Sequence, residues 1–296
     1  MRAISELLPP DALARFSNLN LIARWIVEGF ISGLHKSPYH GFSVEFAEYR
    51  QYAAGDDLRY FDWKALARSD RKYIKKYHSE TNMQAHVLLD CSASMKFGEP
   101  VSKFKYAKAM AAALAYLMVL QQDATGLVLF SDKVINYIPP KSSMRHFREM
   151  ATLLGAAETQ QATSVHSALH FVAETVKRRG LFVILSDLYD DQAKIVSGLR
   201  HLRFKKNEVI VFHVLDHNEL NFPYAMLSEF RDMETNEKIQ VMPASLRAAY
   251  MEAIGGFSDE VRKQCSNMDV DYQLIDTATP FDKVLAKYLY KRQRVG

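Results

Sequence analysis

The sequence predicts an α/β fold with a mainly parallel sheet flanked by helices. From about Asp90 onward, short runs rich in Val, Ile, Leu and Phe alternate with amphipathic stretches of helical length. Parallel strands need a crossover between them, and a helix is the usual crossover. The composition agrees, since 48% of the residues are hydrophobic and 24% are charged. The chain can therefore bury one large core together with a smaller region.

The apolar runs have the length expected of strands. They cover residues 85–89, 126–130, 133–138, 181–186, 208–215 and 270–275. A segment with a different pattern, residues 226–242, has two alternating runs on either side of a turn-like stretch at 234–236. It predicts a β-hairpin inserted beside the main sheet.

Helical periodicity occupies the intervals between these runs. The expected helices span about 10–34, 101–122, 142–155, 164–178, 190–202, 244–266 and 280–291. Thr163 or Ser164 can cap one of these helices, and Pro280 can open the last. The longest apolar run, 109–120, is about half of the roughly 20 residues that a membrane-spanning helix needs. We therefore expect a buried core helix there and no direct insertion into a membrane.

The first 80 residues differ from the rest, because an aromatic-rich, Gly-broken stretch follows the first helical pattern. We expect an N-terminal region at 1–80 and the α/β domain at 81–296. No long linker rich in Ser, Gly or Pro separates them, so the two parts are expected to pack together.

Charge and cysteine content narrow the function classes. The 38 Lys and Arg against 34 Asp and Glu give a net charge of +4, too balanced to indicate a nucleic-acid partner. In the basic run at 68–76, Lys72, Ile74 and Lys76 alternate with Arg71, Tyr73 and Lys75, and this pattern favours an exposed strand. The two cysteines do not imply a disulfide framework. The N-terminus, with its Pro9-Pro10 pair, lacks the apolar stretch of a signal peptide, so we expect a cytoplasmic protein.

The candidate site begins where the run 85–89 ends. Asp90, Ser92 and Ser94 follow on alternate residues, a spacing that lets a loop direct three oxygen atoms at one point. Ligand sites in open α/β sheets lie at this carboxyl edge, and Thr163 and Asp187 are expected at the same edge. Hard oxygen donors predict Mg²⁺, or Mn²⁺ or Ca²⁺, as the ion. Capping of loops and helices by Asp and Ser is the simpler explanation for each residue taken alone.

These residues resemble the metal ion-dependent adhesion site of the von Willebrand factor A family, which combines Asp-x-Ser-x-Ser with a later Thr and a later Asp. The resemblance implies a doubly wound sheet and a metal site at Asp90, Ser92, Ser94, Thr163 and Asp187. It also implies that the ion binds an acidic side chain of a partner protein.

The upstream stretch resembles the bacterial domain-of-unknown-function 58 family, members of which are associated with MoxR-type AAA+ ATPases. The residues that carry this resemblance are Glu45, Tyr49, Arg50, Gly55, Asp56, Asp57, Arg59, Asp62, Trp63, Ala67 and Arg68. The charged ones and Trp63 could tie the N-terminal region to the α/β domain or could form a surface for a partner.

The sequence thus predicts a non-catalytic, metal-dependent adaptor that works with a MoxR-type ATPase on the assembly or maturation of a client. The alternative from another class is a hydrolase that uses the same ion to activate water. A third reading is a binding module whose site has become structural and holds no metal. A general base beside the ligands would favour the hydrolase, and the sequence fixes none.

Overall fold

The computed structural model describes residues 13, 18–34, 49–51, 73–75, 84–160, 165–233 and 237–286. The chain divides into two compact units, residues 1–36 with 83–296 and residues 37–82. The expected boundary near residue 80 assigned the first helix, α1 (Leu19–Leu34), to the N-terminal region. In the structure this helix belongs to the larger unit, where it packs against α3 (Lys103–Leu120). Its buried apolar face explains this placement.

A six-stranded sheet with the order β10-β7-β6-β3-β4-β5 forms the centre of the larger unit. Its strands are β3 (Gln84–Asp90), β4 (Ala124–Phe130), β5 (Val134–Lys141), β6 (Gly180–Ser186), β7 (Glu208–Leu215) and β10 (Asp271–Asp276). Neighbouring strands pair in parallel except β4 and β5, which are antiparallel. The predicted α/β class with a mainly parallel sheet is confirmed.

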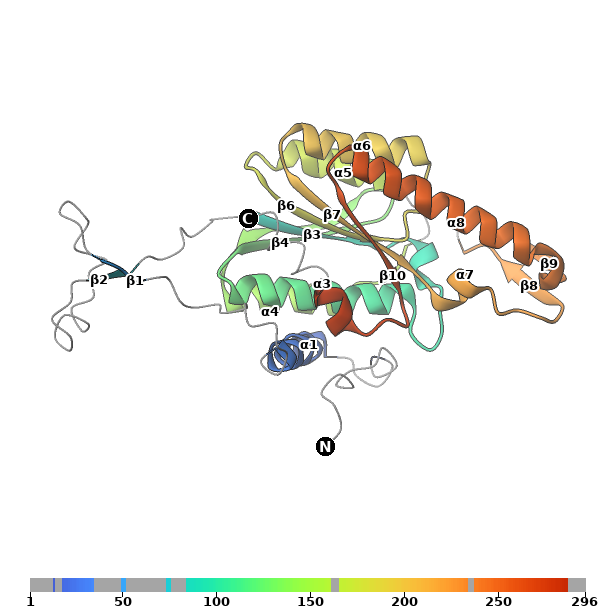
Figure 1. Cartoon of the computed structure of the whole chain (residues 1–296), viewed down its shortest axis with the longest axis horizontal. Helices are drawn as coiled ribbons and strands as arrows, with labels where there is room; N and C mark the ends of the chain where they lie inside the picture. The colour runs from blue at the N-terminus through green and yellow to red at the C-terminus, as the bar shows by residue number, and fades with distance from the viewer. Residues whose placement is uncertain are drawn as a thin grey trace. The chain divides into compact units, whose positions relative to one another are not determined.

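Helices cover both faces of this sheet. Helices α1, α3 and α4 (Met144–Ala156) pack on one side, and α5 (Val165–Thr175), α6 (Gln192–Phe204) and α8 (Pro243–Asn267) on the other (Figure 1). The central strands are buried along nearly their whole length, which is why they appear in the sequence as continuous apolar runs. Helix α3 is buried almost all round because it lies between the sheet and other helices.

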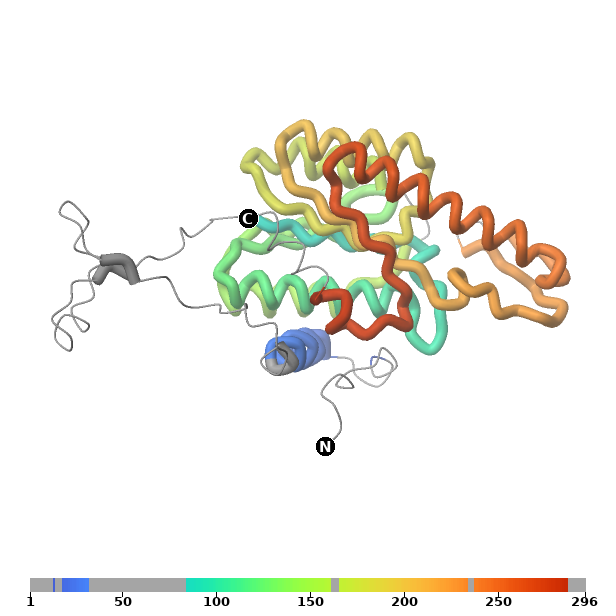
Figure 2. The backbone as a smooth tube through the Cα atoms, in the orientation of Figure 1, coloured from blue at the N-terminus to red at the C-terminus, as the bar shows by residue number. Residues whose placement is uncertain are grey.

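The path of the chain creates a switch point in the sheet. From β3 the chain moves through β4 to β5 at one edge, then returns to β6 on the other side of β3 and continues to β7 and β10 (Figure 2). Ligands of doubly wound sheets bind beside such a reversal, outside the carboxyl ends of the strands. Here the reversal lies between β3 and β6.

The predicted hairpin is present as β8 (Ser228–Arg231) and β9 (Lys238–Val241), which pair in antiparallel fashion. Two short elements were not expected, the 3-10 helix η4 (Ala93–Lys96) and α7 (His217–Asn221). Each is too short to show a helical period. Helix α7 is instead defined by a capping box between Asp216 and Glu219.

After β10 the described chain ends in a helical segment, residues 281–286, directly after Pro280 as expected. It returns to α3, where the ring of Phe281 stacks on Tyr106 with centroids 4.5 Å apart. The Tyr106 hydroxyl donates a hydrogen bond of 2.7 Å to the carbonyl of Thr279. Within the described residues, no helix is long and apolar enough to span a membrane.

The smaller unit, residues 37–82, is described only at β1 (Tyr49–Gln51) and β2 (Tyr73–Lys75), which form an antiparallel pair. Strand β2 confirms the strand expected in the basic run. Tyr49 and Arg50 lie in β1, and Arg50 pairs with Ile74. The other residues that carry the upstream resemblance lie outside the described residues, and they include Glu45, Asp56, Asp57, Arg59, Asp62, Trp63 and Arg68.

Candidate metal centre

Asp90 is the last residue of β3 and is fully buried. One carboxylate oxygen, Oδ1, accepts a hydrogen bond of 2.8 Å from the backbone N–H of Ser92. The other, Oδ2, accepts a hydrogen bond of 2.5 Å from the hydroxyl of Ser186 on the neighbouring strand β6. Asp90 therefore fixes the turn that follows β3 and joins the two strands that flank the switch point.

The turn brings two hydroxyl groups together. The Oγ atoms of Ser92 and Ser94 lie 3.0 Å apart and share a hydrogen bond. Adjacent ligands of an octahedral ion with metal–oxygen distances of about 2.1 Å are separated by about 3.0 Å. Ser92 is buried, whereas Ser94 is half-buried and borders a pocket. The pair thus has the spacing that two adjacent ligands of one small divalent cation require.

Asp187 follows β6 directly and is also fully buried. Its Oδ1 atom accepts a long hydrogen bond of 3.3 Å from the backbone N–H of Tyr189. Burial, as the largest cause, and the nearby charge of Asp187 together raise the pKa of Asp90 to about 7. Two carboxylates held close together without solvent favour a bound cation.

The expected fifth residue, Thr163, lies outside the described residues. The chain just before it is described and runs beside the turn. Gln160 forms a parallel bridge with Ser92, and its N–H donates a hydrogen bond of 2.7 Å to the carbonyl of Cys91. The structure therefore brings four of the five sequence-predicted positions to the edge between β3 and β6, namely Asp90, Ser92, Ser94 and Asp187.

Lys103 is a functional candidate that the sequence analysis missed. It is the first residue of α3, and its side chain is fully buried. Its ammonium lies 2.8 Å from Asp187 Oδ2 and 2.8 Å from Glu219 Oε1. A signal existed in the sequence, because a lysine in the first turn of an apolar helix faces the positive end of the helix dipole. The positive charge of a lysine in this position needs negatively charged groups close to it.

Aromatic rings enclose the same ammonium. The Lys103 nitrogen lies 4.7 Å from the centroid of the Tyr189 ring and 5.9 Å from that of Phe97. Burial by itself would lower the pKa of Lys103, but the charges and hydrogen bonds of Asp187 and Glu219 outweigh burial and raise the pKa above its usual value. Lys103 is therefore a permanent cation inside the site.

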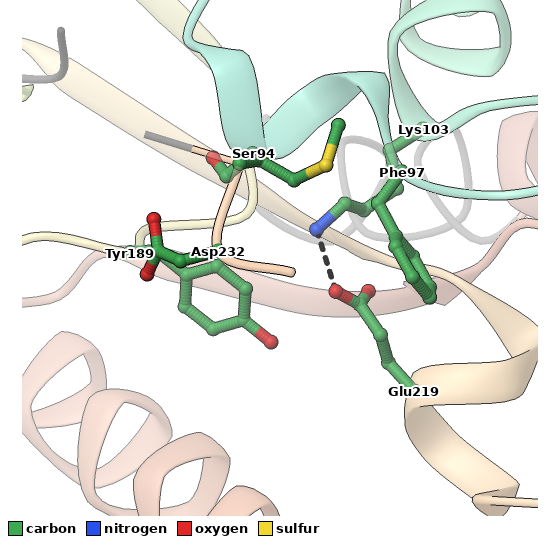
Figure 3. Close-up of a pocket in the computed structure, with 7 residues that line it drawn as sticks. Ser94, Phe97, Lys103, Tyr189, Glu219 and Asp232 are labelled. Atoms are coloured by element: carbon green, nitrogen blue, oxygen red, sulfur yellow. Dashed lines mark hydrogen bonds and ion pairs between the residues drawn. The ribbon is translucent and has the colours of Figure 1, made fainter. Parts of the chain in front are cut away.

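Glu219 comes from α7, which follows the next strand of the sheet, β7. Its second oxygen, Oε2, accepts a hydrogen bond of 2.8 Å from the backbone N–H of Asp216. The capping box thus orients the carboxylate toward Lys103, as Figure 3 shows. The ends of β3, β6 and β7 each contribute a carboxylate, through Asp90, Asp187 and Glu219.

A pocket of about 320 Å³ opens over this edge (Figure 3). Its lining consists of Ser94, Phe97, Lys103, Tyr189, Glu219, Asp232 and Met233. Ser94 is the hydroxyl ligand candidate that borders it, while Asp90 and Asp187 are buried and are not part of the lining. A group that enters the pocket meets Ser94 and the ammonium together.

The donor set fits a hard divalent ion held by hydroxyl and carboxylate oxygens. Among the residues that the structure describes, no three His, Cys, Asp or Glu side chains cluster as a metal site, so zinc coordination has no support here. Lys103 pairs with Asp187 and Glu219, and Asp90 lies buried at the same edge. A Mg²⁺, Mn²⁺ or Ca²⁺ ion would add positive charge beside these carboxylates. Asp90, Ser92, Ser94 and Asp187 are the residues that would hold it.

The sheet order and the switch point are those of a von Willebrand factor A-like fold, as the sequence predicted. The family described as "Protein of unknown function DUF58" matches residues 48–256. The chain belongs to this family, and the match includes β1, β2 and every residue of the candidate metal centre.

The chain is also similar to curated proteins and to solved structures. An uncharacterized protein of Mycobacterium bovis and one of Mycobacterium tuberculosis are each 26% identical over 221 residues, covering 72% of this chain and 68% of theirs. Among solved structures, an aerotolerance-related membrane protein from Bacteroides fragilis has a TM-score of 0.48 at 16% identity, over 71% of this chain and 99% of that one. A von Willebrand factor type A protein from Catenulispora acidiphila has a TM-score of 0.35 at 11% identity, over 62% and 43%.

Proposed function

We propose that this protein is a non-catalytic adaptor that binds other proteins through a divalent metal ion. The observation that carries the proposal is the pair of hydroxyls of Ser92 and Ser94, 3.0 Å apart, at the switch point between two buried carboxylates. Ser94 borders the pocket, so a ligand position on the ion would face the outside. That position would accept a carboxylate of the partner.

The charges around the site support an acidic partner. Hydroxyl ligands are neutral and leave a bound ion with most of its charge, which it supplies as an attraction for an outside anion. Lys103 also lines this pocket, where its ammonium is paired with Asp187 and Glu219. The rings of Tyr189 and Phe97 limit water around it, and electrostatic attraction is stronger where water is excluded.

The absence of a catalytic role is part of the proposal. A hydrolase of this kind needs a group that can take a proton from water next to the ion. Lys103 and Glu219 line the pocket but are paired with each other at 2.8 Å, and burial raises the pKa of Tyr189 above its usual range. The rival hypothesis predicts turnover of phosphoester or peptide substrates with Mg²⁺ or Mn²⁺ that Ser94→Ala abolishes. Turnover of that kind would replace the adaptor proposal.

The partner that we propose is a MoxR-type AAA+ ATPase together with a client protein, in the cytoplasm. The chain belongs to the family, and the association of this family with such ATPases, which the sequence resemblance implies, supports the choice. The ATPase would supply energy from nucleotide hydrolysis, and this chain would bind an acidic side chain of the ATPase or of the client through the ion.

The experiment is a binding assay with full-length protein and the purified ATPase encoded in the same organism. Wild type, Ser94→Ala and Ser266→Ala are compared with Mg²⁺ and with EDTA; Ser266 is an exposed serine on α8 and serves as the control. We expect binding only with Mg²⁺ and only for wild type and the control. Equal binding in EDTA would exclude a metal-bridged contact.

A further inference from the structure

A second cavity lies beside the metal centre, between the β8–β9 hairpin, α7 and the first turns of α8. Its volume is about 450 Å³, which is in the range of sites that hold small ligands or anchoring side chains. Its walls are Phe97, Asn218, Glu219, Phe222, Tyr224, Phe230, Ile239, Val241, Leu246, Ala249 and Tyr250. Glu219 is the one charged residue of this lining, and it is already paired with Lys103. We call this cavity the aromatic groove.

The groove has a rigid aromatic floor. The ring of Phe222 lies 4.6 Å from that of Tyr250 and 5.8 Å from that of Phe230, and Tyr224 meets Phe230 edge-on at 5.3 Å. Phe222 is held at the end of α7 in a left-handed conformation with φ of 43°. That conformation is unusual for a large side chain. The backbone at Phe222 is therefore strained, and this conformation places the Phe222 ring against those of Phe230 and Tyr250.

The rim of the groove is apolar and exposed. Ile239 on the hairpin is 60% exposed, and Leu246 on α8 is 43% exposed. Met226 and Leu227 just before β8 and Met242 just after β9 are 82%, 66% and 55% exposed. Single exposed apolar residues are ordinary, but a group of them on one hairpin and the adjoining helix indicates a surface that binds another molecule.

The groove and the pocket over the metal centre are neighbours, because Phe97 and Glu219 line both. An extended segment of a partner that places a carboxylate in the pocket therefore has its next side chains at the mouth of the groove. The ion that we propose for the pocket would attract a carboxylate, whereas the groove offers rings and aliphatic groups that favour a neutral apolar side chain. The two cavities are complementary to two different side chains of one segment.

We propose that the aromatic groove binds a large apolar side chain of the same partner segment whose acidic residue binds at the metal centre. This inference rests on the proposed function and names the chemistry of the partner, an acidic residue with an aromatic or a large aliphatic residue close to it in sequence. Aromatic anchors in pockets carry much of the binding energy of protein interfaces. The groove then supplies affinity, and the ion supplies orientation.

The test uses full-length protein and a phage-displayed library of random short peptides, selected in Mg²⁺. The best peptide is synthesised, and its dissociation constant is measured for wild type, Ile239→Asp, Leu246→Asp and Phe204→Asp. Phe204 is the control, because it is 85% exposed but lies at the end of α6 and outside the groove. Circular dichroism verifies that each variant is folded.

We expect the selected peptides to combine Asp or Glu with a large apolar residue. Replacing Ile239 or Leu246 is expected to weaken binding about tenfold or more, which corresponds to the loss of one buried apolar contact. Phe204→Asp is expected to bind as wild type. Peptides that show an acidic residue but no apolar preference, with Ile239→Asp binding normally, would overturn the groove while leaving the metal-dependent adaptor intact.

Two other outcomes separate the inference from the proposed function. Selection that is the same in EDTA and for Ser94→Ala would refute metal-dependent binding, and the groove could then not act together with an ion. Sedimentation analysis of the free protein tests whether a second copy of the chain occupies the groove. A wild-type dimer that Ile239→Asp dissociates would show that the groove binds another molecule of this chain, contrary to the proposal.

Discussion

The ammonium of Lys103 lies 2.8 Å from Asp187 Oδ2, so the last carboxylate of the predicted metal site is bound to a lysine of the same chain. The domain therefore carries its own cation at the edge of the site. This arrangement places a positive charge beside the buried carboxylate of Asp187. A divalent ion at the site would therefore compete with the Lys103 ammonium for the carboxylate of Asp187.

The first prediction concerns Lys103→Met. This change leaves the carboxylates of Asp187 and Glu219 buried without their shared cation, which is expected to lower the free energy of unfolding by roughly 3–5 kcal/mol. Urea denaturation of wild type and variant measures the change. Lys105→Met is the control, since Lys105 lies two residues away on the same helix and is exposed. Equal stability of all three proteins would mean that the ion pairs contribute little.

The same variant gives a second prediction about metal. Without Lys103, repulsion between its ammonium and a divalent ion disappears and Asp187 becomes available, so Mg²⁺ is expected to raise the melting temperature of Lys103→Met more than that of wild type. Differential scanning fluorimetry over a range of Mg²⁺ concentrations measures this difference. A smaller Mg²⁺ effect in the variant would show that Lys103 helps to hold the ion instead of competing with it.

Ser94→Ala gives a third prediction. The change removes one of the two hydroxyls that lie 3.0 Å apart, without burying a charge. Mg²⁺ affinity is expected to fall by about tenfold or more, whereas stability in EDTA changes by less than about 0.5 kcal/mol. Isothermal titration calorimetry measures the first quantity and denaturation the second. Unchanged affinity would remove Ser94 from the ligand set.

His86 provides a prediction about pH. It is buried in β3, stacks on Phe182 at 4.9 Å, and neither ring nitrogen has a hydrogen-bond partner. Burial lowers its pKa from 6.5 to about 4, so the unfolded chain takes up the proton first as the pH falls. Wild type is therefore expected to lose up to about 3 kcal/mol of stability from this residue between pH 6.5 and 4.

The comparison with His86→Leu isolates that contribution. Other groups titrate in the same window, and Asp90 acts in the opposite direction because its raised pKa favours the folded state as the pH falls. These groups are present in both proteins, so they cancel in the difference. The advantage of the Leu variant is expected to grow as the pH falls from 6.5 to 4. A constant difference would show that His86 does not resist protonation.

Gly98 gives a prediction about the wall shared by the two cavities. It precedes α3 with φ of 112°, and an added Cβ atom would collide with the carboxylate of Asp216. Gly98→Ala is therefore expected to displace the loop that holds Phe97 and to cost about 1–3 kcal/mol of stability. Gly256→Ala on α8, where nothing lies within 4 Å of the added atom, is expected to be neutral or stabilising. Denaturation of both variants measures the contrast.

The sequence by itself determined most of the helices and strands and placed Asp90 and Asp187 at one edge of the sheet. The central strands and α3 were predictable from continuous apolar runs of strand or helix length, and the hairpin and the other long helices from the period with which apolar residues repeat. Asp90 and Asp187 were predictable as site residues because each directly follows a buried strand, and parallel strands end at one edge. The resemblance carried by the upstream residues gave the family, which the family match confirms.

Only the tertiary structure decided what else reaches that edge. Lys103 is 84 residues from Asp187 and 116 residues from Glu219, and they meet because the sheet order places the ends of β6 and β7 side by side next to the start of α3. The aromatic groove likewise depends on how the hairpin folds against α7 and α8. Periodicity reports which face of an element is buried, but it does not report which element lies opposite. That choice is made by packing of the whole domain.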